Sequence, residues 1–297
     1  MKVKQYPLYV MLVPSLLFLA VFIYAPIYGL SLAFKSFTIS GGIFGSPWSK
    51  PWHDNFFWLK DKEFWNVFLN TLKIASVKFV TGFPAPIVLA LLINEVSHKR
   101  FKKATQTIMY LPHFVSWVIF GGIVYRVIGG DATSPINLLL GLFGIDPVNI
   151  MAEEGNFLWV VVVTSLIKEV GWGTIIFLAA ISGVDAQLYD AASIDGCGQW
   201  QKCRHVTLPA LLPIISILLI LSIPGILSAG FDQIWNLSNS LTARAANILD
   251  IYIIKIGIYG GQYGHATAIG LFLKVLSLGL VLLTNRLSKT SFGYGLF

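Results

Sequence analysis

The sequence carries no charged side chain between Gln5 and Phe34. A helix needs about 20 mainly apolar residues to cross the hydrocarbon core of a bilayer. This stretch is longer than that, and longer than the apolar core of a signal peptide, and no small-residue cleavage site follows it. Lipid offers no hydrogen-bond partner to the backbone, so a stretch of this kind must be helical. We therefore expect a first transmembrane helix at residues 8–32.

Composition extends this expectation to the whole chain. Of 297 residues, 56% are hydrophobic and only 12% are charged, whereas soluble domains average about 25% charged residues. Soluble enzymes, nucleic-acid binders, disordered chains and fibrous proteins are thereby excluded. We expect an all-α polytopic membrane protein whose residues 1–297 form a single transmembrane domain. The five further spans are expected at residues 67–93, 107–128, 157–181, 208–227 and 266–283.

The net charge of +7 follows the predicted topology. Loops rich in lysine and arginine stay in the cytoplasm. Ten of the 21 basic residues occupy four short segments on one predicted side: Lys2, Lys4, Lys99, Arg100, Lys102, Lys103, Lys202, Arg204, Arg286 and Lys289. The opposite loops mix acidic and basic residues. We therefore expect both termini in the cytoplasm.

The sequence shows no catalytic or metal-binding pattern. It contains no GxxxxGK[ST] phosphate loop, no HExxH and no GxSxG, and its five histidines lack metal-ligand spacing. Cys197 and Cys203 are interpreted as free thiols, since their spacing matches neither a redox nor a zinc motif. We expect this chain to bind no cofactor.

The loop at residues 183–207 is the most informative polar segment. Its DAASIDG run predicts a short helix that Gly196 ends, because glycine accepts the left-handed conformation after a helix. The stretch Gln199 to His205 is interpreted as a basic surface turn, and Pro209 as part of the first turn of the next span. Composition alone leaves two interpretations open: an ordinary connecting loop or a docking site for a cytoplasmic protein.

This loop resembles the EAA loop of permease subunits of ATP-binding-cassette (ABC) importers. That pattern is Glu-Ala-Ala, three residues, Gly, nine residues, then Ile-x-Leu-Pro. Here Asp190 replaces the glutamate, while the spacing to Gly196 and to the Leu-Pro pair is kept. The resemblance implies that the following residues couple the chain to an ATPase: Asp190, Ala191, Ala192, Asp195, Gly196, Leu208 and Pro209.

The resemblance extends over almost the whole chain. Asn70-Thr71-Leu72, Tyr110-Leu111-Pro112 and the tail from Gly293 to Phe297 are similar to carbohydrate-uptake permeases of the maltose-type superfamily. The tail and the stretch from Gly42 to Trp48 resemble the branch that takes up polysaccharide fragments, alginate oligosaccharides among them.

The resemblance implies a type I ABC importer permease fold in the bacterial inner membrane. It also implies a second homologous permease, two ATPase subunits that carry ATP and Mg, and an extracytoplasmic solute-binding protein that delivers an oligosaccharide. The alternative is a self-sufficient secondary sugar carrier or channel. That alternative would be favoured by inverted repeats with matching broken helices, which the sequence does not show.

Four charged residues fall near the middle of predicted spans: Lys78, Lys168, Glu169 and Lys274. A charge at this depth costs roughly 2.5–3.5 kcal/mol on insertion scales. We hypothesise that they line a translocation path that attracts acidic, uronate-type sugars; the alternative is pairing with a partner subunit or with backbone carbonyls. Lys168 and Glu169 are neighbours, about 100° apart on a helix, and are not expected to pair.

Aromatic residues complete the predicted substrate path. Trp117, Tyr125 and Trp172 lie in the same spans and offer ring faces to the apolar C–H faces of a pyranose. The alternative for each is helix packing or lipid contact. Outside the spans, the aromatic-rich residues 35–65 predict an interfacial belt or a docking surface. Residues 134–151 predict an interfacial lid, and Pro224-Gly225 predicts a kink or a gate.

Overall fold

The computed structural model describes residues 6–296. Within that part of the chain the only β contact is an isolated bridge between Lys35 and Trp48, and the rest is helix or loop. Five helical runs are long and apolar enough to cross a membrane, or six if one bent pair counts as a single span. Lys2, Lys4 and Phe297, which entered the sequence argument, lie outside the described residues.

Each predicted span coincides with a helical run. These runs are Tyr9–Phe34, Lys62–Glu95, the bent pair Lys99–Phe114 and Trp117–Ile128, Glu154–Ser182, Gln199–Leu227 and Tyr263–Ser291. The chain divides into two compact units, residues 1–66 with 252–276, and residues 67–251 with 277–297. Three helices contain a boundary between the units: α4 (Lys62–Gly82), α14 (Leu249–Ile254) and α15 (Tyr263–Phe292).

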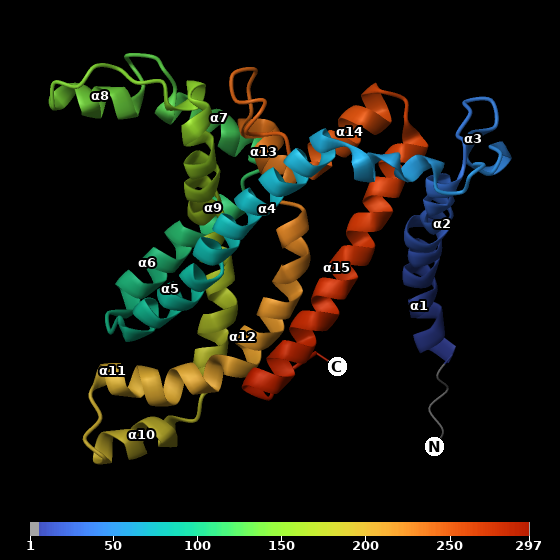
Figure 1. The fold of residues 1–297 in the computed structure, drawn as a ribbon. Coiled ribbons are helices and arrows are strands. Elements are labelled where there is room, and N and C mark those ends of the chain that lie inside the picture. Colours follow the sequence, from blue (N-terminus) through green and yellow to red (C-terminus); the bar gives the residue numbers. More distant parts are fainter. Residues whose placement is uncertain (1–5, 297) are drawn as a thin grey trace. The chain divides into compact units, whose positions relative to one another are not determined.

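The second unit is organised around α9 (Phe157–Ser182), which lies beside α5 (Pro84–Glu95) and α6 (Lys99–Tyr110) (Figure 1). Close approach depends on two glycines that flank Trp172. A Cβ atom at Gly171 would collide with the backbone of Met109, and one at Gly173 would lie 2.9 Å from Pro86. These glycines therefore let α9 pack tightly against α6 and α5.

The third predicted span is not one straight helix. The chain turns by 106° between Phe114 and Trp117, so residues 107–128 belong to a bent pair of helices. Pro112 lies in the short 3-10 segment before the turn and donates no backbone hydrogen bond. Ser116 then caps α7 (Trp117–Ile128) by accepting a hydrogen bond from the backbone N–H of Ile119 at 3.3 Å.

The basic stretch after Gly196 is also more regular than predicted. Residues interpreted as a surface turn form α11 (Gln199–Lys202) and a π-helical turn (Cys203–Thr207), which run directly into α12 (Leu208–Ser222). A π-helical turn is the usual local adjustment where a helix must accommodate an irregularity. Here it ends two residues before Pro209, whose ring nitrogen donates no hydrogen bond.

The fifth predicted span changes from α-helix to 3-10 helix at the Pro-Gly pair and ends at Leu227. α12 ends at Ser222, and a 3-10 segment (Ile223–Leu227) follows. Ala229 and Gly230 then have φ angles of 55° and 92°, so both lie in the left-handed region. The chain continues as α13 (Phe231–Leu237).

The predicted lid contains a short helix, α8 (Pro135–Leu142), near the start of α9 (Figure 1). Buried Asn137 holds it in place: its amide donates to the carbonyls of Gly129, Asp131 and Val148 at 3.0–3.2 Å. Its apolar side chains Leu138, Leu139 and Leu142 are exposed.

The first unit has an aromatic core of its own. Trp58 and Phe64 are fully buried, and their ring centroids lie 4.3 Å apart. Lys35, only 2% exposed, orders the loop before them. Its Nζ donates to the carbonyl of Ile43 at 2.7 Å and lies 5.2 Å from the ring centroid of Trp48. The aromatic-rich stretch at residues 35–65 is thus folded around buried aromatic side chains.

Candidate functional site

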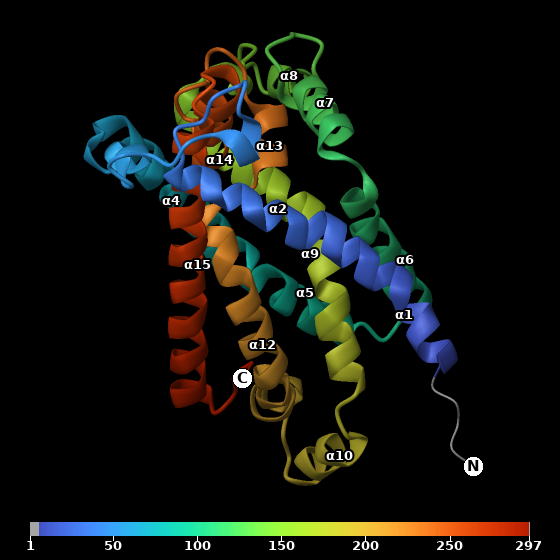
Figure 2. The same cartoon turned by 90° about the vertical axis from the view of Figure 1, so that its right-hand side faces the viewer.

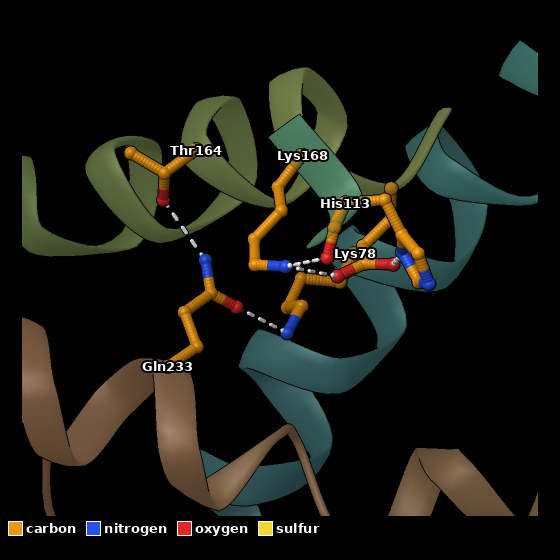
Figure 3. A network of polar contacts seen from close by, with 6 residues as sticks. Lys78, His113, Thr164, Lys168 and Gln233 are labelled. Atoms are coloured by element: carbon orange, nitrogen blue, oxygen red, sulfur yellow. Dashed lines mark hydrogen bonds and ion pairs between the residues drawn. The ribbon is translucent and has the colours of Figure 1, made fainter. Parts of the chain in front are cut away.

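Lys78, from α4, reaches the break that follows α12. Its Nζ donates to the carbonyl of Ala229 at 2.8 Å and to Oε1 of Gln233 at 2.6 Å. The amide nitrogen of Gln233 in turn donates to the carbonyl of Val161 at 2.6 Å and to Oγ1 of Thr164 at 2.9 Å. One lysine therefore connects α4, α13 and α9 (Figure 3).

Lys168, one turn beyond Thr164 on α9, makes the corresponding contact at the other broken span. It is only 4% exposed, and its Nζ donates to the carbonyl of His113 at 2.8 Å. The ammonium also lies 5.2 Å from the ring centroid of Trp117, a cation–π contact. Trp117 thus packs against a charge from within the protein.

Lys168 also pairs with its sequence neighbour, against the prediction. Its Nζ lies 3.5 Å from Oε1 of Glu169. The two Cα–Cβ bonds do point apart, but both side chains are long and flexible. Both side chains contact His113: the ammonium of Lys168 binds its backbone carbonyl, and the carboxylate of Glu169 binds its imidazole. These two contacts bring the ammonium and the carboxylate together.

Glu169, His113 and Trp172 form the more accessible part of the site. Oε2 of Glu169 lies 2.7 Å from Nδ1 of His113, and the imidazole stacks on the indole of Trp172 with the planes 4° apart. The side chain of Glu169 is 42% exposed and Trp172 is 44% exposed. The carboxylate of Glu169 and part of the indole of Trp172 are therefore accessible.

Two adjoining cavities meet at Lys78. The smaller, of about 60 Å³, is bounded by Thr81, Ser165 and Glu169 among others. The larger, of about 340 Å³, is bounded by Phe79, Ser165 and the broken segment from Ser222 to Gly230. Lys78 and Ser165 line both cavities.

The remaining predicted path residues lie elsewhere. The hydroxyl of Tyr125 donates to the carbonyl of Leu237 at 3.0 Å, two turns along α7 from Trp117. Tyr125 also lines a cavity of about 590 Å³ with Arg126. Lys274 is exposed and belongs to the first unit. Within the second unit the structure thus groups Lys78, Trp117, Lys168, Glu169 and Trp172, and leaves Tyr125 outside the group.

Sequence reasoning missed three members of this group: His113, Thr164 and Gln233. His113 directly follows the proline that bends the third span, and Gln233 follows the Pro-Gly break. A polar residue next to a break in an apolar segment was the signal that could have found them.

The predicted coupling loop is an exposed helical hairpin. Asp185 caps α10 (Ala186–Ile194) by accepting a hydrogen bond from the N–H of Gln187 at 2.9 Å. Gly196, with φ 78°, ends it, and the N–H of Cys197 returns to the carbonyl of Ala192 at 2.9 Å. Tyr189 ties the hairpin to the π-helical turn through Thr207.

This hairpin lies beyond the ends of α9 and α12 in both views (Figures 1 and 2). Asp190, Ala191, Asp195 and Pro209 are exposed, whereas Ala192 and Leu208 are partly covered. Three exposed apolar side chains beside them escaped the prediction: Leu188, Ile194 and Trp200. Both cysteines of the hairpin are free thiols.

Comparison with known proteins places this geometry in a family. Residues 82–290 match the model described as "binding-protein-dependent transport system inner membrane component". The chain belongs to this family. It is a multi-pass permease of the inner membrane, as the sequence resemblance implied.

Two relatives from Bacillus subtilis cover most of the permease. Protein LplB is 38% identical over 98% of this chain and 91% of its own length. The polygalacturonan/rhamnogalacturonan transport system permease protein YteP is 38% identical over 97% of this chain and 89% of its own length.

Two solved structures share the fold. A chain of a bacterial alginate ABC transporter, in complex with an alginate pentasaccharide-bound periplasmic protein, superposes with a TM-score of 0.88. It is 35% identical and covers 99% of this chain and 97% of its own. A chain of an ABC transporter that imports the acidic polysaccharide alginate gives 0.86 at 36% identity, over 97% and 96% of the two chains. The predicted type I ABC importer permease fold is confirmed.

Proposed function

We propose that this permease forms, with a second homologous permease, the translocation path for acidic oligosaccharides of the uronate type. The observation that carries the proposal is the side-chain group at the two helix breaks. Lys78 and Lys168 bring two ammonium groups to it, and Glu169 brings one carboxylate. The relatives named for polygalacturonan and alginate transport act on polymers of the same acidic class.

The two ammonium groups share a single carboxylate in this arrangement. Both donate to backbone carbonyls, which are neutral, and the carboxylate of Glu169 forms an ion pair with Lys168 and lines the smaller cavity with Lys78. The local balance is therefore positive. A positive balance in a region of low dielectric attracts a carboxylate much more strongly than it would in bulk water.

Trp172 supplies the contact to the sugar ring. His113 covers one face of the indole, so the opposite face is the one that a pyranose would contact. An aromatic face beside a few charged groups is the usual composition of a small-molecule site. Glu169 would accept hydrogen bonds from sugar hydroxyls through its exposed oxygens.

Energy coupling is assigned to the hairpin at residues 183–207. Two ATPase subunits would bind on the cytoplasmic side, one of them at Asp190, Ala191, Ala192, Asp195, Gly196, Leu208 and Pro209. ATP and Mg would be held by those subunits, and this chain would bind no cofactor. An extracytoplasmic binding protein would deliver the oligosaccharide, and both termini would lie in the cytoplasm.

The test compares oligosaccharides of equal length that differ only in charge. The complete importer, with binding protein and ATPase, is reconstituted in liposomes and supplied with uronate and neutral oligomers. We expect ATP-dependent uptake of the uronate oligomers in preference to the neutral ones. Equal uptake of both would contradict charge selection, and sugar uptake by this chain alone, without ATPase, would contradict the importer assignment.

A further inference from the structure

Both broken helical segments of the second unit have a carbonyl bound by a lysine from a neighbouring helix. At the break after α12, Lys78 binds the carbonyl of Ala229. At the bend between α6 and α7, Lys168 binds the carbonyl of His113. A carbonyl released by a helix break lacks its intrahelical partner and needs a donor at membrane depth.

The Lys78 break carries backbone strain. Ala229 has a φ angle of 55°, which a residue with a Cβ atom adopts only when its surroundings enforce it. Gly230 follows with a φ angle of 92°, and a Cβ atom there would lie 2.9 Å from Nζ of Lys78. The ammonium therefore sits against the strained segment and holds it by its carbonyl.

The same ammonium is tied to the straight helix α9 through Gln233. Gln233 is 2% exposed, accepts from Lys78 and donates to Val161 and Thr164. Moving the broken segment away from α9 would stretch this chain of hydrogen bonds (Figure 3).

Lys78 also forms part of the boundary between the two cavities. One cavity extends toward Thr81 and Glu169, and the other toward Ser222 and Gly225. Lys78 and Ser165 are the two residues that line both cavities. Of these two, only the lysine is long and held by a contact that a backbone movement at Ala229 would break.

We propose that Lys78 is a gate residue of the translocation path. Its contacts with Ala229 and Gln233 hold the break after α12 in a closed position and keep the two cavities separate. Release of these contacts lets the segment from Ile223 to Gly230 move and joins the cavities. This proposal rests on the proposed function, since it places the path at this site; Lys78 acts through Ala229 and is a positioning residue.

The experiment measures access to the smaller cavity. Cys197 and Cys203 are replaced by serine, and Thr81→Cys places a single thiol in the smaller cavity, in the complete importer. Labelling by a hydrophilic methanethiosulfonate reagent is then timed with and without Lys78→Met. We expect labelling about tenfold faster with Lys78→Met, because loss of a charged hydrogen bond changes a two-state ratio by at least this factor.

Three controls define the result. Ser222→Cys reports on the larger cavity, and its labelling should not change. Lys73→Met removes an exposed lysine of the same helix and should leave labelling at residue 81 unchanged. Lys78→Arg, which keeps the charge and the donors, should restore slow labelling. If Lys78 served only to stabilise the fold, Lys78→Arg would not restore slow labelling at residue 81 selectively.

ATPase activity gives a second readout. Lys78→Met should raise hydrolysis in the absence of binding protein, whereas Lys73→Met should not. If that variant fails to assemble with its partner subunits, Lys78→Gln, which is too short to bridge both acceptors, takes its place. Unchanged labelling at residue 81 overturns the proposal, as does unchanged hydrolysis in the absence of binding protein. The labelling experiment needs no substrate. Its result therefore tests the gate independently of whether the importer takes up uronate oligosaccharides.

Discussion

The imidazole of His113 lies parallel to the indole of Trp172, with ring centroids 4.5 Å apart and planes 4° apart. His113 comes from the bend that follows Pro112, and Trp172 comes from the middle of α9. The stack therefore joins a broken helix to a straight one. It also fixes the orientation of the indole, so that its free face is presented without rotational freedom.

Removal of this indole is expected to weaken sugar binding. Trp172→Ala should raise the KM of uronate-dependent uptake about tenfold, which corresponds to about 1.4 kcal/mol. Trp172→Phe keeps a smaller aromatic face and should raise it less. Initial rates of uptake in liposomes measure both. An unchanged KM in the alanine variant would show that the indole serves only helix packing.

Loss of a buried charge is expected to change selectivity. Lys168→Met should lower uptake of uronate oligomers more than uptake of neutral oligomers of equal length, because it removes one of two ammonium groups. Lys274→Met removes an exposed lysine of the other unit and is a matched comparison. If both substrates lose uptake equally in Lys168→Met, the lysine supports the bend at His113 and does not select charge.

Glu169→Gln is expected to strengthen binding of acidic oligosaccharides while slowing their transport. The substitution keeps the shape and removes the negative charge, so the site becomes more positive. Uronate oligomers should bind more tightly, with a lower KM, while release slows and the maximal rate falls. A KM that rises for acidic and neutral oligomers alike would contradict this assignment. The measurement is uptake over a range of oligosaccharide concentrations.

The coupling hairpin offers a backbone test at Gly196. Its φ angle of 78° suits glycine, and a β-branched residue there costs on the order of 1–3 kcal/mol. Gly196→Val should distort the end of α10 and uncouple ATP hydrolysis from uptake, while the permease still inserts. Ser193→Ala, within the exposed face of α10, is the control. Normal coupling in Gly196→Val would argue against a docking role for the hairpin.

Close packing of α9 against α6 should depend on Gly171. A Cβ atom there meets the backbone of Met109, which cannot move aside as a side chain could. Gly171→Ala should therefore lower the stability of the detergent-solubilised permease by about 1–3 kcal/mol. Gly122→Ala, where a Cβ atom would meet open space, should have little effect. Thermal unfolding of both variants measures the difference.

Much of the architecture was predictable because its causes are local. The helical runs follow from apolar segments such as residues 8–32, since lipid leaves the backbone no alternative to helix. The end of α10 at Gly196 follows from the conformational freedom of one glycine. The break at Pro224 follows from a proline beside a glycine. The family could be recognised because the coupling hairpin keeps its spacing within one short segment.

The partners of the charged side chains were decided by tertiary structure. Insertion cost shows from the sequence that Lys78 and Lys168 need partners, but several candidates satisfy that need. Their actual partners, the carbonyls of Ala229 and His113, are 151 and 55 residues away along the chain. The pairing of Lys168 with Glu169 likewise depends on where His113 draws both side chains.

Sequence alone thus determined that the chain is a helical membrane protein, because lipid and backbone chemistry act on neighbouring residues, and the spacing in the loop at residues 183–207 gave the resemblance to permeases. Only the tertiary structure decided that the two central lysines bind carbonyls at helix breaks. It also decided that Tyr125 stands apart from Trp172. The reason is physical: a hydrogen bond between helices depends on how they cross, and crossing is set by packing contacts such as those of Gly171 and Gly173.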